Sequence, residues 1–111
     1  MATAIASSYM NITLAHIQGG EVTGSIDESV RHAITKLSHI HFPATEKSKS
    51  RIIKMGENSK FVYNTGCPSI DLIKNTPIRN DRYHINQNGV GCIIDFAKPF
   101  LLVVQHPVTS E

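Results

Sequence analysis

Three carboxylates surround a Gly-Gly turn in the segment HIQGGEVTGSIDESVRHAITK, residues 16–36. Glu21 directly follows the two glycines, and Asp27 and Glu28 begin a helical pattern. Carboxylates near the end of a buried strand can act as general acids or bases when their surroundings tune their pKa values. The alternative is that Asp27 and Glu28 only complement the dipole of the helix that they begin. The pattern favours a cap role for Glu28 and leaves Asp27 as the candidate catalyst.

A histidine is the second candidate for proton transfer. None of the six histidines has the spacing of a metal site such as H-E-x-x-H, and we expect no metal. His106 differs from the others because it follows the apolar run FLLVV, residues 100–104, and precedes Pro107. A histidine at a strand end can meet a ligand in a cleft and transfer protons near neutral pH. The alternative is an ordinary hydrogen-bonded histidine at a strand terminus.

The elements that must position these residues alternate between strands and helices. Apolar spacing predicts helices over residues 1–11, 25–37, 45–55 and 68–74, and strands over 13–18, 39–44 and 60–65. Ser25 and Glu28 have the spacing of a capping box, and Thr45 is the expected cap of the next helix. The helix over 25–37 is expected to bury one stripe: Ile26, Val30, Ala33, Ile34 and Leu37. This order predicts an α/β fold, a Rossmann-like parallel sheet with right-handed crossovers.

The chain is expected to have three parts. Residues 1–75 read as the second half of an N-terminal Rossmann-like domain, and residues 76–99, rich in Asn, Gly, Pro and charge, as an inter-domain linker. Residues 100–111 read as the first strand of a C-terminal domain, because FLLVV is typical of a strand buried on both faces. Such a strand needs covering elements, so we expect the chain to be the middle piece of a longer, two-domain protein.

Composition excludes several classes of function. The 111 residues allow one domain at most, and 41% hydrophobic with 18% charged residues is ordinary for a globular chain. A formal charge of +2 gives no reason to expect nucleic acid, and no apolar run is long enough to span a membrane. The four cations expected on one helix lack interleaved aromatic residues and read as a solvated face: Lys47, Lys49, Arg51 and Lys54.

Known motifs narrow the field further. Cys67 and Cys92 show no CxxC spacing, and the N-terminus has no signal-peptide pattern, so we expect a reduced, cytoplasmic protein. The absence of G-x-x-x-x-G-K-[ST], G-x-G-x-x-G and G-x-S-x-G weakens kinase, dinucleotide oxidoreductase and α/β-hydrolase interpretations.

Four segments together resemble a known enzyme family. HIQGGEVTGSIDESVRHAITKLSHIHF, MGE, NTGCPSIDLI and LLVVQHPVTSE are similar, in that order, to the hydrolysing UDP-N-acetylglucosamine 2-epimerases, in particular the sialic-acid pathway branch. The resemblance implies a glycosyltransferase-B-like architecture of two Rossmann-like domains that face a cleft. It implies conversion of UDP-N-acetylglucosamine into UDP and N-acetylmannosamine, by elimination of UDP to a 2-acetamidoglucal and then hydration, without a cofactor.

The resemblance also implies roles for individual residues. Asp27 falls on a catalytic carboxylate of the family, and His106 falls on its active-site histidine. Gln18 falls where many members have a second catalytic carboxylate, and an amide cannot exchange a proton as a general base. Either Glu21 takes over this role, or this branch works differently, or its activity is reduced. A further family carboxylate is expected in a Gly-Asp-Arg segment before the first residue.

Three functions are therefore open from the sequence. The first is the middle portion of an epimerase that is inactive by itself and binds UDP-N-acetylglucosamine in the complete protein. The second is a non-catalytic, self-associating nucleotide-sugar-binding module; exposed sheet edges favour pairing between chains, so we expect a homo-oligomer and consider a strand-exchanged dimer. The third is a related two-domain glycosyltransferase that uses the same nucleotide sugar.

Overall fold

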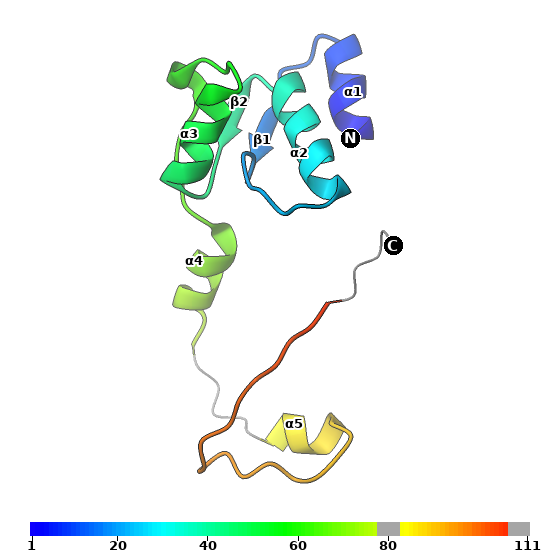
Figure 1. The fold of residues 1–111 in the computed structure, drawn as a ribbon, viewed down its shortest axis with the longest axis vertical. Helices are drawn as coiled ribbons and strands as arrows, with labels where there is room; N and C mark the ends of the chain where they lie inside the picture. The colour runs from blue at the N-terminus through cyan, green and yellow to red at the C-terminus, as the bar shows by residue number, and fades with distance from the viewer. Residues whose placement is uncertain (78–82, 107–111) are drawn as a thin grey trace. The chain divides into compact units, whose positions relative to one another are not determined.

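The computed structural model describes residues 1–77 and 83–106 (Figure 1). Residues 1–75 form one compact unit, and the described residues from 76 onward belong to a second. The first unit contains, in chain order, α1 (Ala2–Tyr9), β1 (Ala15–Ile17), α2 (Ile26–Leu37), β2 (Ile40–Phe42), α3 (Glu46–Lys54), the 3-10 turn η1 (Ser59–Phe61) and α4 (Pro68–Asn75). The second unit contains α5 (Tyr83–Asn88).

The strands of the first unit are parallel, as the alternating pattern predicts. In the register of β1 and β2, His16 lies beside His41 and Ile17 beside Phe42. The expected third strand over 60–65 is reduced to a parallel bridge between Val62 and His41. Residues 59–61 instead form a 3-10 turn, in which the Lys60 N–H donates a hydrogen bond to the Asn58 side chain. The chain therefore has the α/β, Rossmann-like architecture expected of it, with a shortened third strand.

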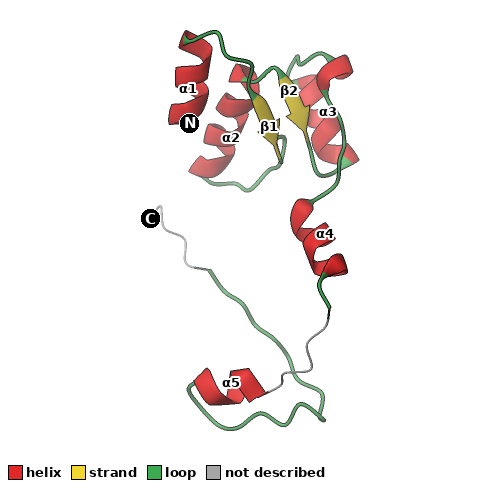
Figure 2. Ribbon diagram, turned by 180° about the vertical axis from the view of Figure 1, so that it is seen from behind, coloured by secondary structure: helices red, strands yellow, loops and turns green. Residues whose placement is uncertain are grey.

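Both connecting helices cover the same face of the sheet. Figure 1 shows α2 and α3 in front of the two strands, and Figure 2, from behind, shows the strands nearer the viewer. His16 is on the covered side, because its ring contacts Thr35 of α2. Alternation along the strands turns Ile17 to the other side, where it is 61% exposed. Within the described residues the sheet thus buries its histidines and leaves an apolar face open.

The core of the first unit is small and partly polar. Its fully buried side chains include Ile52 of α3, Thr35 of α2 and His41 of β2. The stripe expected on α2 is wrong at its start: Ile26 is 63% exposed, and the other four members are only half-buried. The buried position of α2 is Thr35, because the helix packs on the sheet near its C-terminal end.

One predicted cap is confirmed and one is wrong. The hydroxyl oxygen of Thr45 accepts a hydrogen bond from the Ser48 N–H, 3.1 Å away. Helix α3 begins at Glu46, the residue after Thr45. Ser25 precedes α2 but makes no side-chain cap bond. Glu28 reaches back to the preceding loop, where its Oε2 accepts from the backbone N–H groups of Thr23 and Gly24. The acidic residue therefore orders the loop rather than closing a capping box.

The second unit contains the residues expected as an inter-domain linker and a following strand. The segment expected as a linker contains α5, and the Asn86 side chain exchanges two hydrogen bonds with the backbone of Ile94. The expected strand over 100–104 is absent: Leu101 is 94% exposed, and no described residue pairs with it in a ladder. A strand needs a neighbour to satisfy its backbone groups. The role of these residues in another domain stays a prediction. Among the described residues, no helix has the length and apolar character needed to cross a membrane.

Ile52 and its neighbour Ile53 offer a matched test of the core. Ile52 is completely buried, whereas Ile53 is 36% exposed on the same helix. Ile52→Ala should lower the free energy of unfolding by about 2–5 kcal/mol, because it removes buried methyl groups and leaves a cavity. Ile53→Ala should cost about 1 kcal/mol or less. Urea unfolding of both variants checks this, and equal costs would contradict the packing described.

Candidate functional site

The turn that follows β1 forms the centre of the candidate site. It runs from Gln18 to Glu21 at the carboxyl end of β1, where an open α/β sheet binds its ligands. Gln18 has a φ of 60° and Gly20 a φ of 78°, so the chain reverses direction sharply here. The N–H of Gln18 donates to the Phe42 carbonyl at the end of β2, 2.9 Å away. The turn is therefore anchored to both strands.

The two glycines are required by close contacts on both sides. A Cβ on Gly19 would lie 2.8 Å from Nδ1 of His16 and 3.2 Å from the Thr35 hydroxyl oxygen. A Cβ on Gly20 would lie 2.5 Å from the Ser48 carbonyl oxygen of α3. The turn is thus wedged between β1 and α2 on one side and α3 on the other.

Two arginines hold the same turn through its carbonyl groups. Nη1 of Arg31 donates to the carbonyl oxygen of Glu21 at 2.9 Å, and Nη1 of Arg51 donates to the carbonyl oxygen of Gly20. Asp27 and Arg31 have the i,i+4 spacing of a helical ion pair but do not form one in the described structure, because Arg31 turns to this loop instead. Neither arginine contact has a local signal in the sequence, since each joins residues ten or more positions apart.

The candidate carboxylates have different surroundings. Glu21 lines a hollow of about 290 Å³ together with two cations of α3, Lys47 and Arg51. Asp27 is exposed in the first turn of α2, without a hydrogen bond to any described residue. For Glu28, the hydrogen bonds from the Gly24 and Thr23 N–H groups lower the pKa of the carboxyl group. The oxygens of Asp27 are therefore available, whereas Glu28 is committed to the loop.

Gln18 has an unexpected partner in Cys67. Nε2 of Gln18 donates to Sγ of Cys67 across 3.2 Å, although the residues are 49 positions apart. Cys67 directly precedes α4, and the N–H groups of Ile70 and Ser69 lower the pKa of its thiol below the ordinary value. Neither cysteine is a fully buried core residue, since Cys67 is half-buried and Cys92 is exposed.

Two histidines lie on the covered face of the sheet, and their surroundings lower their pKa values. Burial is the main cause that lowers the pKa of His16, with His41 and Arg31 adding to it. Burial also lowers the pKa of His41, although Glu57 opposes the shift from 3.5 Å. Glu57 is itself paired with Lys36. Nδ1 of His41 has no hydrogen-bond partner among the described residues.

The remaining predicted site residue belongs to the second unit. His106 is exposed after the FLLVV run, and Pro107 and the rest of the QHPVT motif lie outside the described residues. His106 and Asp27 belong to different units, and a meeting of their side chains in one site with Gln18 and Glu21 stays a prediction. In the part of the chain that the structure describes, no three metal-ligating side chains converge.

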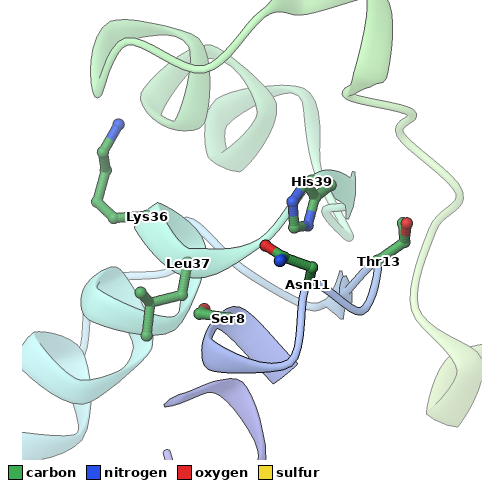
Figure 3. Close-up of a pocket in the computed structure, with 6 residues that line it drawn as sticks. All are labelled: Ser8, Asn11, Thr13, Lys36, Leu37 and His39. Atoms are coloured by element: carbon green, nitrogen blue, oxygen red, sulfur yellow. The ribbon is translucent and has the colours of Figure 1, made fainter. Parts of the chain in front are cut away.

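A separate pocket lies at the opposite ends of the strands. It measures about 270 Å³ and is lined by Ser8, Asn11, Thr13, Lys36, Leu37 and His39. Figure 3 shows Asn11 and His39 side by side, with the Lys36 side chain directed away from them. Thr13 precedes β1 and His39 precedes β2, so this pocket is at the amino ends and contains none of the candidate catalytic residues.

Comparison with known proteins covers the whole chain. The family model described as UDP-N-acetylglucosamine 2-epimerase matches residues 1–111. The chain belongs to the UDP-N-acetylglucosamine 2-epimerase family. The predicted resemblance to this family is therefore confirmed.

Individual relatives in the family share the same stretch. The chain is 40% identical to the UDP-N,N'-diacetylbacillosamine 2-epimerase (hydrolyzing) of Legionella pneumophila, over all of this chain and 28% of that protein. It is 37% identical to the UDP-N-acetylglucosamine 2-epimerase of Neisseria meningitidis, over 88% of this chain and 25% of that protein. The chain thus spans about a quarter of the length of the curated relatives that it matches.

A solved structure of the family has the same fold. The crystal structure of the Neisseria meningitidis UDP-GlcNAc 2-epimerase bound to UDP-GlcNAc superposes with a TM-score of 0.56 and 29% sequence identity. The match covers 68% of this chain and 24% of that chain.

Gly20 and Gly66 test the wedge described above. Both have a positive φ, 78° and 80°, but a Cβ on Gly66 would meet no atom within 4 Å. Gly66→Ala should therefore cost only the backbone strain, about 1–2 kcal/mol. Gly20→Ala should cost about 1–3 kcal/mol more, because its methyl group overlaps the Ser48 carbonyl. Denaturant unfolding measures the difference, and an equal loss in both variants would refute the close contact with α3.

The two buried histidines should make the fold sensitive to acid. Their folded pKa values lie below the ordinary value of 6.5, so the unfolded chain binds protons first. The histidine contribution to the free energy of unfolding should be constant above pH 7 and fall as the pH drops below about 6.5. Urea midpoints measured from pH 8 to pH 5.5 check this. His16→Asn should weaken the dependence and the exposed control His39→Gln should preserve it; a flat profile in the wild type would contradict the assignment.

Proposed function

We propose that the protein containing this chain is a hydrolysing 2-epimerase of UDP-linked 2-acetamido sugars. Its reaction would release UDP and the free 2-epimer, N-acetylmannosamine when the substrate is UDP-N-acetylglucosamine. The observation that carries the proposal is the family match over all 111 residues, together with acidic residues at the carboxyl end of the parallel strands.

The reaction needs groups that move a proton at C2 and help UDP to leave. Asp27 is proposed as a proton-transfer group, because its carboxylate is exposed in the first turn of α2 and is not used for local structure. Glu21 is proposed as the second carboxylate. Its hollow also contains Lys47 and Arg51, two cations that attract an anionic diphosphate.

Gln18 has a different part in this proposal. Its amide donates to Cys67, so the side chain is directed to the start of α4 and serves to join two loops of the site. Proton transfer at this point would then depend on Glu21, three residues later, and on His106, which is proposed to approach from the second domain. In this proposal a glycosyltransferase and a non-catalytic module become outcomes of the test.

The assay should also include a second substrate of the same class. The Legionella pneumophila relative is named for UDP-N,N'-diacetylbacillosamine, a different 2-acetamido sugar nucleotide, and is 40% identical to this chain. Both nucleotide sugars should therefore be offered to the protein, and the ratio of their kcat/KM values assigns the preferred substrate.

The test measures release of UDP and of free sugar by the protein that contains this chain. Asp27→Asn should lower kcat by about 10²–10⁴-fold, the usual contribution of a general acid or base, and His106→Ala should have a comparable effect. Asp71→Asn is the matched control, because Asp71 is also an exposed aspartate in the first turn of a helix. It should retain wild-type turnover.

Each of three results would contradict the proposal. Unchanged turnover in Asp27→Asn would refute its assigned role, and transfer of the sugar to an acceptor without free product would favour a glycosyltransferase. Binding of the nucleotide sugar without UDP release would favour the non-catalytic module.

A further inference from the structure

His16 is a half-buried polar residue that the proposed reaction does not use. It is the central residue of β1, on the face covered by α2 and α3, and His41 of β2 is its neighbour in register. Its ring lies between Thr35 of α2 and the glycines of the turn. The ring is therefore held by contacts with the protein on both sides and is not a freely solvated side chain.

The hydrogen bonds of Thr35 define the protonation of the His16 ring. The Thr35 hydroxyl lies 3.1 Å from the Arg31 carbonyl oxygen, which can only accept, so the single hydroxyl proton is used there. The same oxygen lies 3.2 Å from Nδ1 of His16. Both contacts are hydrogen bonds only when Nδ1 of His16 carries a hydrogen and donates it to Thr35. A neutral ring, which burial and the nearby Arg31 favour, is then the Nδ1–H tautomer.

The same ring supports the turn from below. A Cβ on Gly19 would lie 2.8 Å from Nδ1 and 3.1 Å from Cε1 of His16, so the Gly19 backbone rests directly on the edge that bonds to Thr35. Gln18 and Gly20, on either side of Gly19, both have positive φ angles. A shift of the ring would therefore move Gly19 and alter the directions in which Gln18 and Glu21 leave the turn.

We propose that His16 is a positioning residue of the 2-epimerase site: its Nδ1–H bond to Thr35 fixes the ring that supports Gly19 and so holds Gln18 and Glu21 at the carboxyl end of the sheet. His16 contacts no reacting atom in this scheme. The inference rests on the proposed function for its kinetic consequence, but its structural part stands on the geometry alone.

The kinetic test uses three substitutions that separate the donor from the ring volume. The amide nitrogen of Asn can take the place of Nδ1, so His16→Asn should keep kcat within about threefold of the wild type. His16→Gln carries its amide one methylene farther and should lose at least about tenfold in kcat, with a smaller change in KM, as should Thr35→Val. Thermal unfolding of each variant reports whether the fold survives, and Thr35→Val, which conserves volume, carries the test if His16→Gln does not fold.

The structural test does not depend on turnover. Two-dimensional ¹H–¹⁵N spectra that correlate the ring nitrogens with the carbon-bound ring protons should identify His16 as the Nδ1–H tautomer at pH 7.5. The amide signals of Gly19 and Gly20 should move in His16→Gln and Thr35→Val and stay close to the wild type in His16→Asn.

The outcomes separate this inference from the proposed function. An Nε2–H tautomer for His16, or equal kcat values for His16→Asn and His16→Gln, would overturn the positioning role. If the wild-type protein releases no UDP from either nucleotide sugar, the proposed function fails, and the tautomer and the glycine signals still decide whether His16 holds the turn.

Discussion

The first unit depends on the close fit of two glycines between three elements of secondary structure. Gly19 lies against the His16 ring and the Thr35 hydroxyl, and Gly20 lies against the Ser48 carbonyl. Side chains at either position would separate β1 and α2 from α3. Because the turn can approach both helices, its carbonyl groups come within reach of Arg31 and Arg51. Packing contacts and hydrogen bonds therefore both hold the four-residue turn from Gln18 to Glu21.

One face of the sheet carries polar side chains and the opposite face carries apolar ones. The face covered by α2 and α3 carries His16 and His41, each neutral and close to polar partners. The opposite face carries Ile17 and other apolar side chains, which the described residues leave largely exposed. The chain spans about a quarter of the length of the curated relatives that it matches. Nδ1 of His16 has a partner in the Thr35 hydroxyl, and Nε2 of His41 lies 3.5 Å from Glu57, so each ring keeps one polar contact on this face.

Local signals in the sequence predicted much of the first unit. Thr45 caps the N-terminus of α3 by accepting a hydrogen bond from the N–H of Ser48, three positions away. A cap between residues so close in the sequence can be predicted from the sequence. Predictions that depended on burial were less accurate. Ile26 fits the helical stripe but is exposed, and FLLVV has the composition of a buried strand but pairs with no described residue. Hydrophobic periodicity states which residues are able to be buried, and only neighbouring elements decide whether they are.

The sequence by itself determined the alternation of strands and helices, the Gly-Gly turn, the acidic start of α2 and membership of the epimerase family. The tertiary structure decided how the site is held. It directs Gln18 to Cys67, 49 residues away, and Arg51 to Gly20, 31 residues away. It also assigns Glu28 to the loop and places His16 under Gly19. The physical reason is that caps and turns are set by interactions within a few residues, whereas these contacts exist only after the strands have paired and the helices have packed on them.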